Sequence, residues 1–232
     1  MKKIRKGEML LKVAACVLVL SACGSETSQV AASGDMSGPW KAGIHYIPID
    51  PTPLSESPRG KLEVTEVFNY GCPACYVFEP QWVLWAKSQP AYVQPVRLPQ
   101  VNNANDRSYA RLYYTLIALN REDVHEAVYD TIHRQGNSLI GATDAESLQL
   151  QIEFANAHGI SAEVFRRAYQ AASTLENAEL AEKLTREYRV IDTPTIVVNR
   201  RLATGVSRAG GSQFLLLVMQ DLVRRELSKV SN

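Results

Sequence analysis

The chain lacks any apolar stretch long enough to cross a membrane. A membrane-spanning helix needs about 20 consecutive apolar residues, whereas the longest uninterrupted apolar run, from Val13 to Leu20, has eight. A basic segment, residues 2–12, precedes this run, and small residues follow it up to Cys23. A basic start, a short apolar stretch and a small-residue cleavage site are typical of a secretory signal peptide. We therefore expect residues 1–22 to be removed and the rest of the chain to be exported.

The sequence also lacks an excess of positive charge. The whole chain has a formal net charge of +1. Removing the export peptide takes away five basic residues and one acidic residue, which leaves the mature chain at −3. Proteins that bind nucleic acids usually carry a basic patch or stripe, so we expect no nucleic-acid partner. The hydrophobic content of 46% is sufficient for a packed core.

Cysteine is scarce, with four residues in 232. Cys16 lies in the apolar run that is removed, and Cys23 would begin the mature chain. Only Cys72 and Cys75 then remain. A disulfide between residues so close in sequence closes almost no loop and contributes little entropic stabilisation. The pair is therefore better explained by redox chemistry than by stability.

Two other interpretations of the cysteine pair are weaker. A structural zinc site needs about four ligands at fixed spacing, but the chain has no second cysteine pair and its four histidines show no ligand-like grouping. An inert disulfide would not explain why a predicted strand precedes the pair and a predicted helix follows it. We expect no metal, and no cofactor other than a redox-active Cys72–Cys75 disulfide.

Local patterns place the cysteine pair between a strand and a helix. Apolar residues predict a strand over 62–68, which ends just before Tyr70 and Gly71. From Cys72 the apolar spacing becomes helical, and Pro80 should kink this helix. Two further strands are predicted at 44–49 and 92–98.

A block of helices is predicted over residues 105–189, where apolar residues recur at i, i+3 and i+4. Thr143 and Glu146 match a capping box, and Ser161 and Ser173 are expected to cap two more helices. After this block, residues 195–198 and 201–204 predict a strand hairpin, and a final helix is expected from Ser212.

The position of the pair favours reactivity at Cys72. A cysteine attacks as its thiolate, which the N–H groups and dipole at a helix N-terminus stabilise. Pro73 suits the first turn of the helix because it has no N–H to leave unsatisfied. Cys75 lies three residues further on, on the same helix face. We interpret Cys72 as the sulfur that exchanges with substrates and Cys75 as the sulfur that resolves the mixed disulfide.

A strand ending in Cys-Pro-x-Cys, a large helical insertion and an x-Pro before a downstream strand resemble the DsbA-type thiol:disulfide interchange branch of the thioredoxin superfamily. The resemblance spans residues 44 to 229. It implies an α/β fold, in which residues 41–104 and 190–232 form a thioredoxin-like domain and residues 105–189 form an all-helical insertion. Leu20-Ser21-Ala22-Cys23 also resembles a bacterial lipobox, which implies acylation of Cys23 and a lipoprotein whose residues 23–40 are a flexible tether.

The family resemblance implies further site residues. Thr193-Pro194 matches the cis-proline loop that offers backbone groups to a substrate; the alternative is an ordinary trans turn proline. Glu66 matches an acidic residue beneath the disulfide, where burial would raise its pKa and let it relay the proton of Cys75; the alternative is a solvated strand glutamate. Ala74 departs from the family pattern, because the best-known members have histidine there. We therefore expect a higher Cys72 pKa and a less oxidising couple than in those members.

These residues predict a thiol:disulfide oxidoreductase. By resemblance, the leading hypothesis is a periplasmic, lipid-anchored dithiol oxidase that acts on exported cysteine-containing proteins and is reoxidised by a DsbB-type membrane protein. A disulfide isomerase or reductase is one alternative, although the roughly 20 residues between Cys23 and the first strand leave no room for the dimerisation domain of isomerases. A lipid-anchored chaperone or adhesion scaffold without catalysis is another, since a fold does not determine a function.

Overall fold

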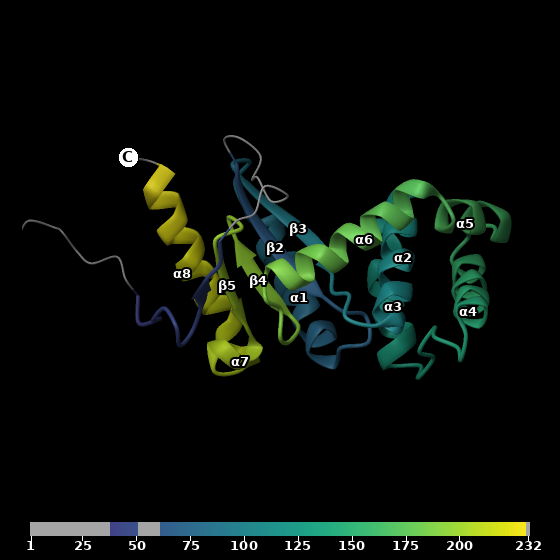
Figure 1. Cartoon of the computed structure of the whole chain (residues 1–232), viewed down its shortest axis with the longest axis horizontal. Helices are drawn as coiled ribbons and strands as arrows, with labels where there is room; N and C mark the ends of the chain where they lie inside the picture. Colours follow the sequence, from purple (N-terminus) through teal and green to yellow (C-terminus); the bar gives the residue numbers. More distant parts are fainter. Residues whose placement is uncertain (1–37, 51–60, 231–232) are drawn as a thin grey trace, which may run out of the picture. The chain divides into compact units, whose positions relative to one another are not determined.

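A computed structural model describes residues 38–50 and 61–230 of the chain. The expected signal peptide, the expected lipidation site Cys23 and most of the expected tether lie outside these residues. Five strands form one sheet in the order β1-β5-β4-β2-β3 (Figure 1). Their bounds are β1 (Ile47–Pro48), β2 (Leu62–Phe68), β3 (Val93–Pro99), β4 (Thr195–Val198) and β5 (Leu202–Gly205).

Strand β2 lies in the interior of the sheet. It pairs in parallel with β3 and antiparallel with β4, and all seven of its residues are buried. The register places Glu66 opposite Arg97 on one side and Ile196 on the other. Burying a carboxylate is costly, and the neighbouring Arg97 offsets only part of this cost for Glu66.

Alternate residues of β4 pack against different helices. Ile196 and Val198 belong to a core formed with α1 (Pro73–Lys87) and α8 (Ser212–Val230). Val197, between them, belongs to a second core with α6 (Ala172–Glu187). This division follows from the two-residue period of a strand. The sheet is therefore covered on both faces.

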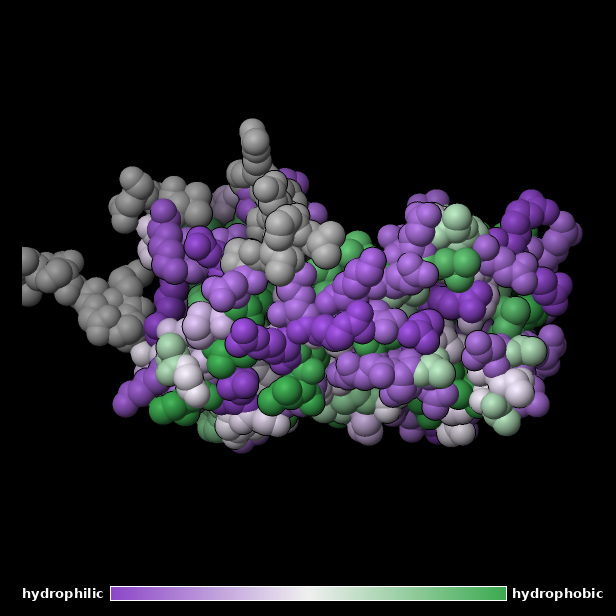
Figure 2. Space-filling view, viewed as in Figure 1, coloured by the Kyte–Doolittle hydropathy of each residue, from purple (hydrophilic) through white to green (hydrophobic). Residues whose placement is uncertain are grey.

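The segment between β3 and β4 is helical. It comprises α2 (Ala104–Ala118), the 3-10 helix η2 (Glu122–Val124), α3 (His125–His133), α4 (Asp144–Ala157), α5 (Ala162–Tyr169) and α6. Helices α2 to α5 share a third core, which also takes in Phe68, Tyr70 and Cys75. Figure 1 shows α6 running from this helical group back toward the sheet, and Figure 2 shows a hydrophilic band along its course. The redox motif thus lies where the helical insertion meets the sheet.

Most strand predictions are confirmed. The strand predicted over 62–68 is β2, and the predicted hairpin is β4 and β5. Its turn residues Asn199 and Arg200 have φ values of 52° and 54°, as a type I′ turn requires. The strand predicted over 44–49 is wrong in extent, because residues 43–45 form a turn and only Ile47–Pro48 pair with β5.

The predicted helix starts need correction at two positions. Thr143 caps α4 by accepting the Glu146 N–H, as expected. The Glu146 carboxylate, however, accepts the N–H of Ala142 instead of completing the capping box. Ser173 caps nothing, because α6 already begins at Ala172 and its N-cap is Ala171.

The remaining helix expectations concern single positions. Ser161 caps α5 as expected. Helix α1 continues through Pro80 without a break. The short helix α7 (Val206–Ala209), which follows β5, was not predicted. In the part of the chain that the structure describes, no helix combines the length and apolarity needed to span a bilayer.

Candidate active site

The redox motif begins at the first turn of α1. Cys72 is the N-cap residue, with extended backbone angles, and Pro73 follows at the first helical position. The sulfur of Cys72 is half-buried and that of Cys75 is fully buried. Both are free thiols, so the structure represents the reduced form.

The pKa values of the two thiols are shifted in opposite directions. The pKa of Cys72 is lowered to about 5, chiefly because the Cys75 thiol donates a hydrogen bond to it. The Thr193 side chain and the backbone N–H groups of Cys75 and Ala74 add to this effect, while burial opposes it. Burial raises the pKa of Cys75 well above its ordinary value. At neutral pH the pair therefore holds a Cys72 thiolate and a Cys75 thiol.

The Thr193–Pro194 loop lies against Cys72. The peptide bond between these residues is cis, as expected. Where Cys72 carries its proton, its Sγ donates to the Thr193 carbonyl oxygen at 3.2 Å. The structure thus brings together two segments 121 residues apart in sequence.

Asn69 organises the turn between β2 and α1. Its side-chain oxygen accepts the Gly71 N–H at 2.8 Å, and its carbonyl oxygen accepts the Cys72 N–H at 3.0 Å. Its own backbone N–H donates to Cys75 Sγ at 3.5 Å. The side-chain NH₂ donates to Asp106 of α2 at 2.7 Å. One residue therefore contacts both cysteines and ties the redox turn to the helical insertion.

Glu66 belongs to a buried group of charged and polar residues. Its carboxylate lies 3.4 Å from Arg97, which also pairs with Glu79 at 2.5 Å. Burial, followed by the charge of Glu79, raises the pKa of Glu66 to about 8. Burial would raise the pKa of Glu79 too, but His125 at 3.6 Å and Arg97 hold it below its ordinary value. His125 also bonds to the Tyr70 hydroxyl at 2.7 Å, which links this group to the redox turn.

Tyr129 of α3 contributes a further buried polar atom. Within the described residues its hydroxyl has no hydrogen-bond partner, and no direct hydrogen bond joins Glu66 to Cys75. Burial raises the pKa of Tyr129, and the charges of Cys75 and Glu66 raise it further. Tyr129 thus interacts electrostatically with both Cys75 and Glu66, the two residues between which a proton relay is expected.

Ala74 places no imidazole inside the motif. A histidine of α3, His133, lies close to the redox turn instead. Its ring stacks on Tyr76 with centroids 5.0 Å apart, and its Nε2 lies 2.8 Å from the Tyr70 carbonyl oxygen. In the described part of the chain, no group of three or more histidine, cysteine, aspartate or glutamate side chains could hold a metal ion.

Local patterns indicated the cysteines, and the family resemblance implied Glu66 and the proline loop, but neither indicated Asn69, Arg97, His125 or Tyr129. Asn69 could have been noticed, because a polar residue directly after a buried strand and before a helix start is typical of a turn. The other three come from β3 and α3, and no local signal links them to the motif.

Two curated relatives are similar over most of their length. The thiol:disulfide interchange protein DsbA of Pseudomonas aeruginosa is 35% identical over 188 residues, which cover 81% of this chain and 86% of that protein. The DsbA of Azotobacter vinelandii is 35% identical over 189 residues, covering 81% and 85%. The chain belongs to the DsbA family. No protein-family model matches the sequence.

Solved DsbA structures share the fold. The crystal structure of Pseudomonas aeruginosa DsbA matches with a TM-score of 0.74 and 32% identity, over 83% of this chain and 97% of that one. The DsbA of Xylella fastidiosa matches with a TM-score of 0.71 and 26% identity, over 79% and 96%. The expected thioredoxin-like fold with a helical insertion is confirmed. As a DsbA-family member, the chain is a thiol:disulfide oxidoreductase.

Proposed function

We propose that this chain is a dithiol oxidase that introduces disulfides into exported proteins through Cys72 and Cys75. The observation that carries the proposal is the contrast between the two sulfurs, since the pKa of Cys72 is about 5 and that of Cys75 is raised. A stable Cys72 thiolate favours the reduced protein. A couple whose reduced form is stabilised is the more oxidising one.

The reaction starts from the oxidised protein. A substrate thiolate attacks Cys72 Sγ, the Cys72–Cys75 bond breaks, and Cys75 leaves with the electron pair. A second substrate thiolate then attacks the substrate sulfur of the mixed disulfide and releases the Cys72 thiolate. Two electrons pass from the two substrate thiolates to the protein, Cys72 is released as a thiolate, and the Cys75 sulfur gains one proton.

Glu66 is the proposed source of that proton. With a pKa of about 8, its carboxyl is protonated at neutral pH and can give a proton to Cys75 as this sulfur leaves. The Tyr129 hydroxyl, buried without a partner in the described residues, is the proposed relay between them. Pro73 starts the helix that presents Cys72, and the backbone at Thr193 and Pro194 would receive the substrate chain.

The proposed location is the periplasmic face of a bacterial membrane. The pattern of residues 1–23 supports a lipoprotein signal peptide over 1–22, acylation of Cys23 and a tether over 23–40. The element order supports a thioredoxin-like domain from 41–104 and 190–232 and a helical insertion from 105–189. Each substrate oxidation leaves the protein reduced, so a membrane reoxidase of the DsbB type is the proposed partner.

A disulfide isomerase or reductase is the second candidate, and one observation favours it. Ala74 supplies no charge to the Cys72 thiolate, whereas a protonated histidine in the motif would stabilise it and make the couple more oxidising. The pKa of about 5 at Cys72 argues that the helix N-terminus and Cys75 stabilise the thiolate sufficiently for oxidation.

The test is oxidation of a reduced, unfolded protein with glutathione disulfide as the terminal oxidant. The mature chain should accelerate disulfide formation catalytically, and Cys72→Ser should not. Cys75→Ser should stop turnover while accumulating a mixed disulfide at Cys72. A Cys72→Ser variant that keeps full activity would refute the proposal and favour a chaperone-like role.

A further inference from the structure

A groove of about 750 Å³ opens at the end of α1 that lies away from the redox motif. Aromatic and aliphatic side chains dominate its walls, among them Trp40, Trp85, Tyr92 and Leu217. No acidic side chain lines the described part of the groove, and Arg224 is its one charged lining residue there. The described groove is thus an amphipathic, aromatic surface, with Ser88, Gln89 and Gln220 among its apolar side chains and no negative charge.

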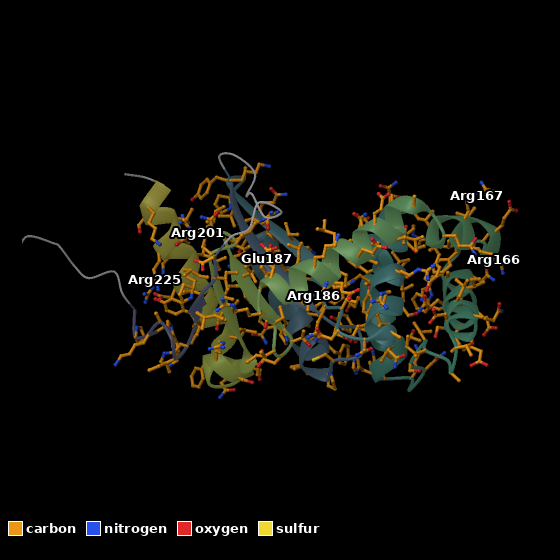
Figure 3. The ribbon with its side chains drawn as sticks, viewed as in Figure 1. Arg166, Arg167, Arg186, Glu187, Arg201 and Arg225 are labelled. Atoms are coloured by element: carbon orange, nitrogen blue, oxygen red, sulfur yellow. The ribbon has the colours of Figure 1, made fainter. Side chains whose placement is uncertain are left out.

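The first described residues of the chain enter the fold at this groove. Pro39 and Trp40 are part of its wall. Arg225 of α8, labelled in Figure 3, donates to the Gly38 and Trp40 carbonyl oxygens at 3.3 Å and 3.0 Å. Arg225 is itself held by Asp221 at 2.6 Å. The point at which the proposed tether reaches the domain is therefore fixed beside the groove.

The tether limits how far this point can move from a lipid at Cys23. Residues 24–38 number 15, and a random coil of that length has a root-mean-square extension of roughly 20 Å. Helix α1, with 15 residues, is about 22 Å long, so Cys72 lies about that far from the groove. Lipid attachment would keep the groove near the bilayer and leave the redox motif on the distant end of α1.

The charges beside the groove suit an anionic membrane. Lys41 and Lys87 are exposed and adjacent in sequence to groove residues, and the side chain of Arg224 is largely exposed. The acidic residues of α8 near the groove, Asp221 and Glu226, are buried and paired with basic side chains. Tryptophan and tyrosine favour the membrane interface, and lysine and arginine are attracted to anionic headgroups.

We propose that this groove and its rim form a membrane-contact surface that lies in the headgroup region of the bilayer and directs Cys72 away from the lipid. The inference rests on the lipid attachment proposed above. The tether itself is a poor occupant of the groove, because residues 24–37 are mostly small and polar.

The fluorescence of the three tryptophans of the chain can report contact between this surface and lipid. Trp40 and Trp85 line the groove, and Trp82 packs on Trp85 with ring centroids 5.2 Å apart. A maleimide phospholipid is coupled to Cys23 of the oxidised mature chain, in which the Cys72–Cys75 disulfide protects the other two sulfurs. The protein is then bound to vesicles of phosphatidylethanolamine and phosphatidylglycerol, with and without brominated acyl chains.

Brominated lipid should measurably quench the fluorescence of Trp40, the half-buried tryptophan of the groove, more than that of the buried Trp82 and Trp85, as expected for a side chain at the headgroup and acyl boundary. Leu217→Glu and Tyr92→Glu should remove most of this quenching, and both side chains are exposed enough, at 50% and 53%, to be replaced without unfolding the domain. Leu84→Glu is the matched control, because Leu84 is 72% exposed on α1 but does not line the groove, and its quenching should equal that of the parent chain.

Absence of bromine-dependent quenching in vesicle-bound protein would overturn the proposal. Equal quenching in the parent chain and in Leu217→Glu would also overturn it. A dimer that forms without vesicles and is lost in Leu217→Glu would assign the groove to a second copy instead. Because the lipid is attached chemically, these outcomes do not depend on acylation in cells, which is tested separately by the mass of the cellular protein. They also do not depend on the result of the oxidase assay.

Discussion

Replacing Glu66 by glutamine should stabilise the protein, and increasingly so as the pH rises. The pKa of this buried carboxyl is about 8 in the folded protein, against an ordinary value of 4.5. Above pH 4.5 the unfolded chain is ionised at Glu66, so folding requires the uptake of a proton from water. The folded state binds more protons than the unfolded state, and stability must therefore fall as the pH rises.

The magnitude follows from the pKa difference. Proton uptake costs about 1.4 kcal/mol for each pH unit above the ordinary pKa, or about 3 kcal/mol at pH 7. The cost vanishes below pH 4.5 and becomes constant above about pH 8. Glutamine has a similar shape and no proton to take up, and Arg97 keeps its ion pair with Glu79. Glu66→Gln should therefore gain about 3 kcal/mol at pH 7 relative to the parent chain.

Urea denaturation of the reduced parent chain and of Glu66→Gln at pH 4.5, 7 and 8.5 measures this difference. The two proteins should be similar at the lowest pH and clearly separated at the two higher values. A difference that does not change with pH would refute the reasoning, because it would show that packing and not ionisation separates the two proteins. A parent chain more stable than the variant at pH 8.5 would also refute it.

Three further predictions concern the redox turn. Alkylation of the reduced protein should report a Cys72 pKa of about 5, with Cys75 unreactive across the neutral range; half-maximal reactivity near pH 8.5 would contradict the proposed thiolate. Ala74→His should raise the reduction potential by roughly 30 to 60 mV, the equivalent of a charge-assisted hydrogen bond, and an unchanged glutathione equilibrium would exclude a role for this position. Asn69→Ala should lose about 2 kcal/mol of stability, because its hydrogen bond to the Asp106 carboxylate is charge-assisted; a loss below about 0.5 kcal/mol in urea denaturation would show that the turn does not depend on this bond.

Apart from Glu66 and Thr193-Pro194, which the family resemblance implied, the parts of the site that the sequence predicted are encoded by adjacent residues. The strand before Cys72, the helix after it and the Asn199–Arg200 turn are specified by local patterns of apolar and turn residues, and each lies where it was expected. The opposite pKa shifts of Cys72 and Cys75 also have a local origin, because Cys75, three residues further on, donates a hydrogen bond to Cys72 and is itself buried.

The missing parts depend on tertiary packing. Glu66 lies beside Arg97 only because β2 and β3 align in one register. His125 and Tyr129 reach the motif only because α3 packs against α1. The prediction that Ser173 caps a helix was wrong for a different reason. A serine can cap a helix only if the helix begins directly after it. Here the preceding turn already starts α6 at Ala172.

The direction of catalysis is tested most directly by the glutathione equilibrium of the purified mature chain. The proposal predicts a reduction potential well above about −270 mV, the level of thioredoxin, and below about −120 mV, the value known for a strongly oxidising DsbA. A potential at or below the thioredoxin level would contradict the oxidase, because Cys72 and Cys75 would then be held as a disulfide too stable to be transferred to substrates.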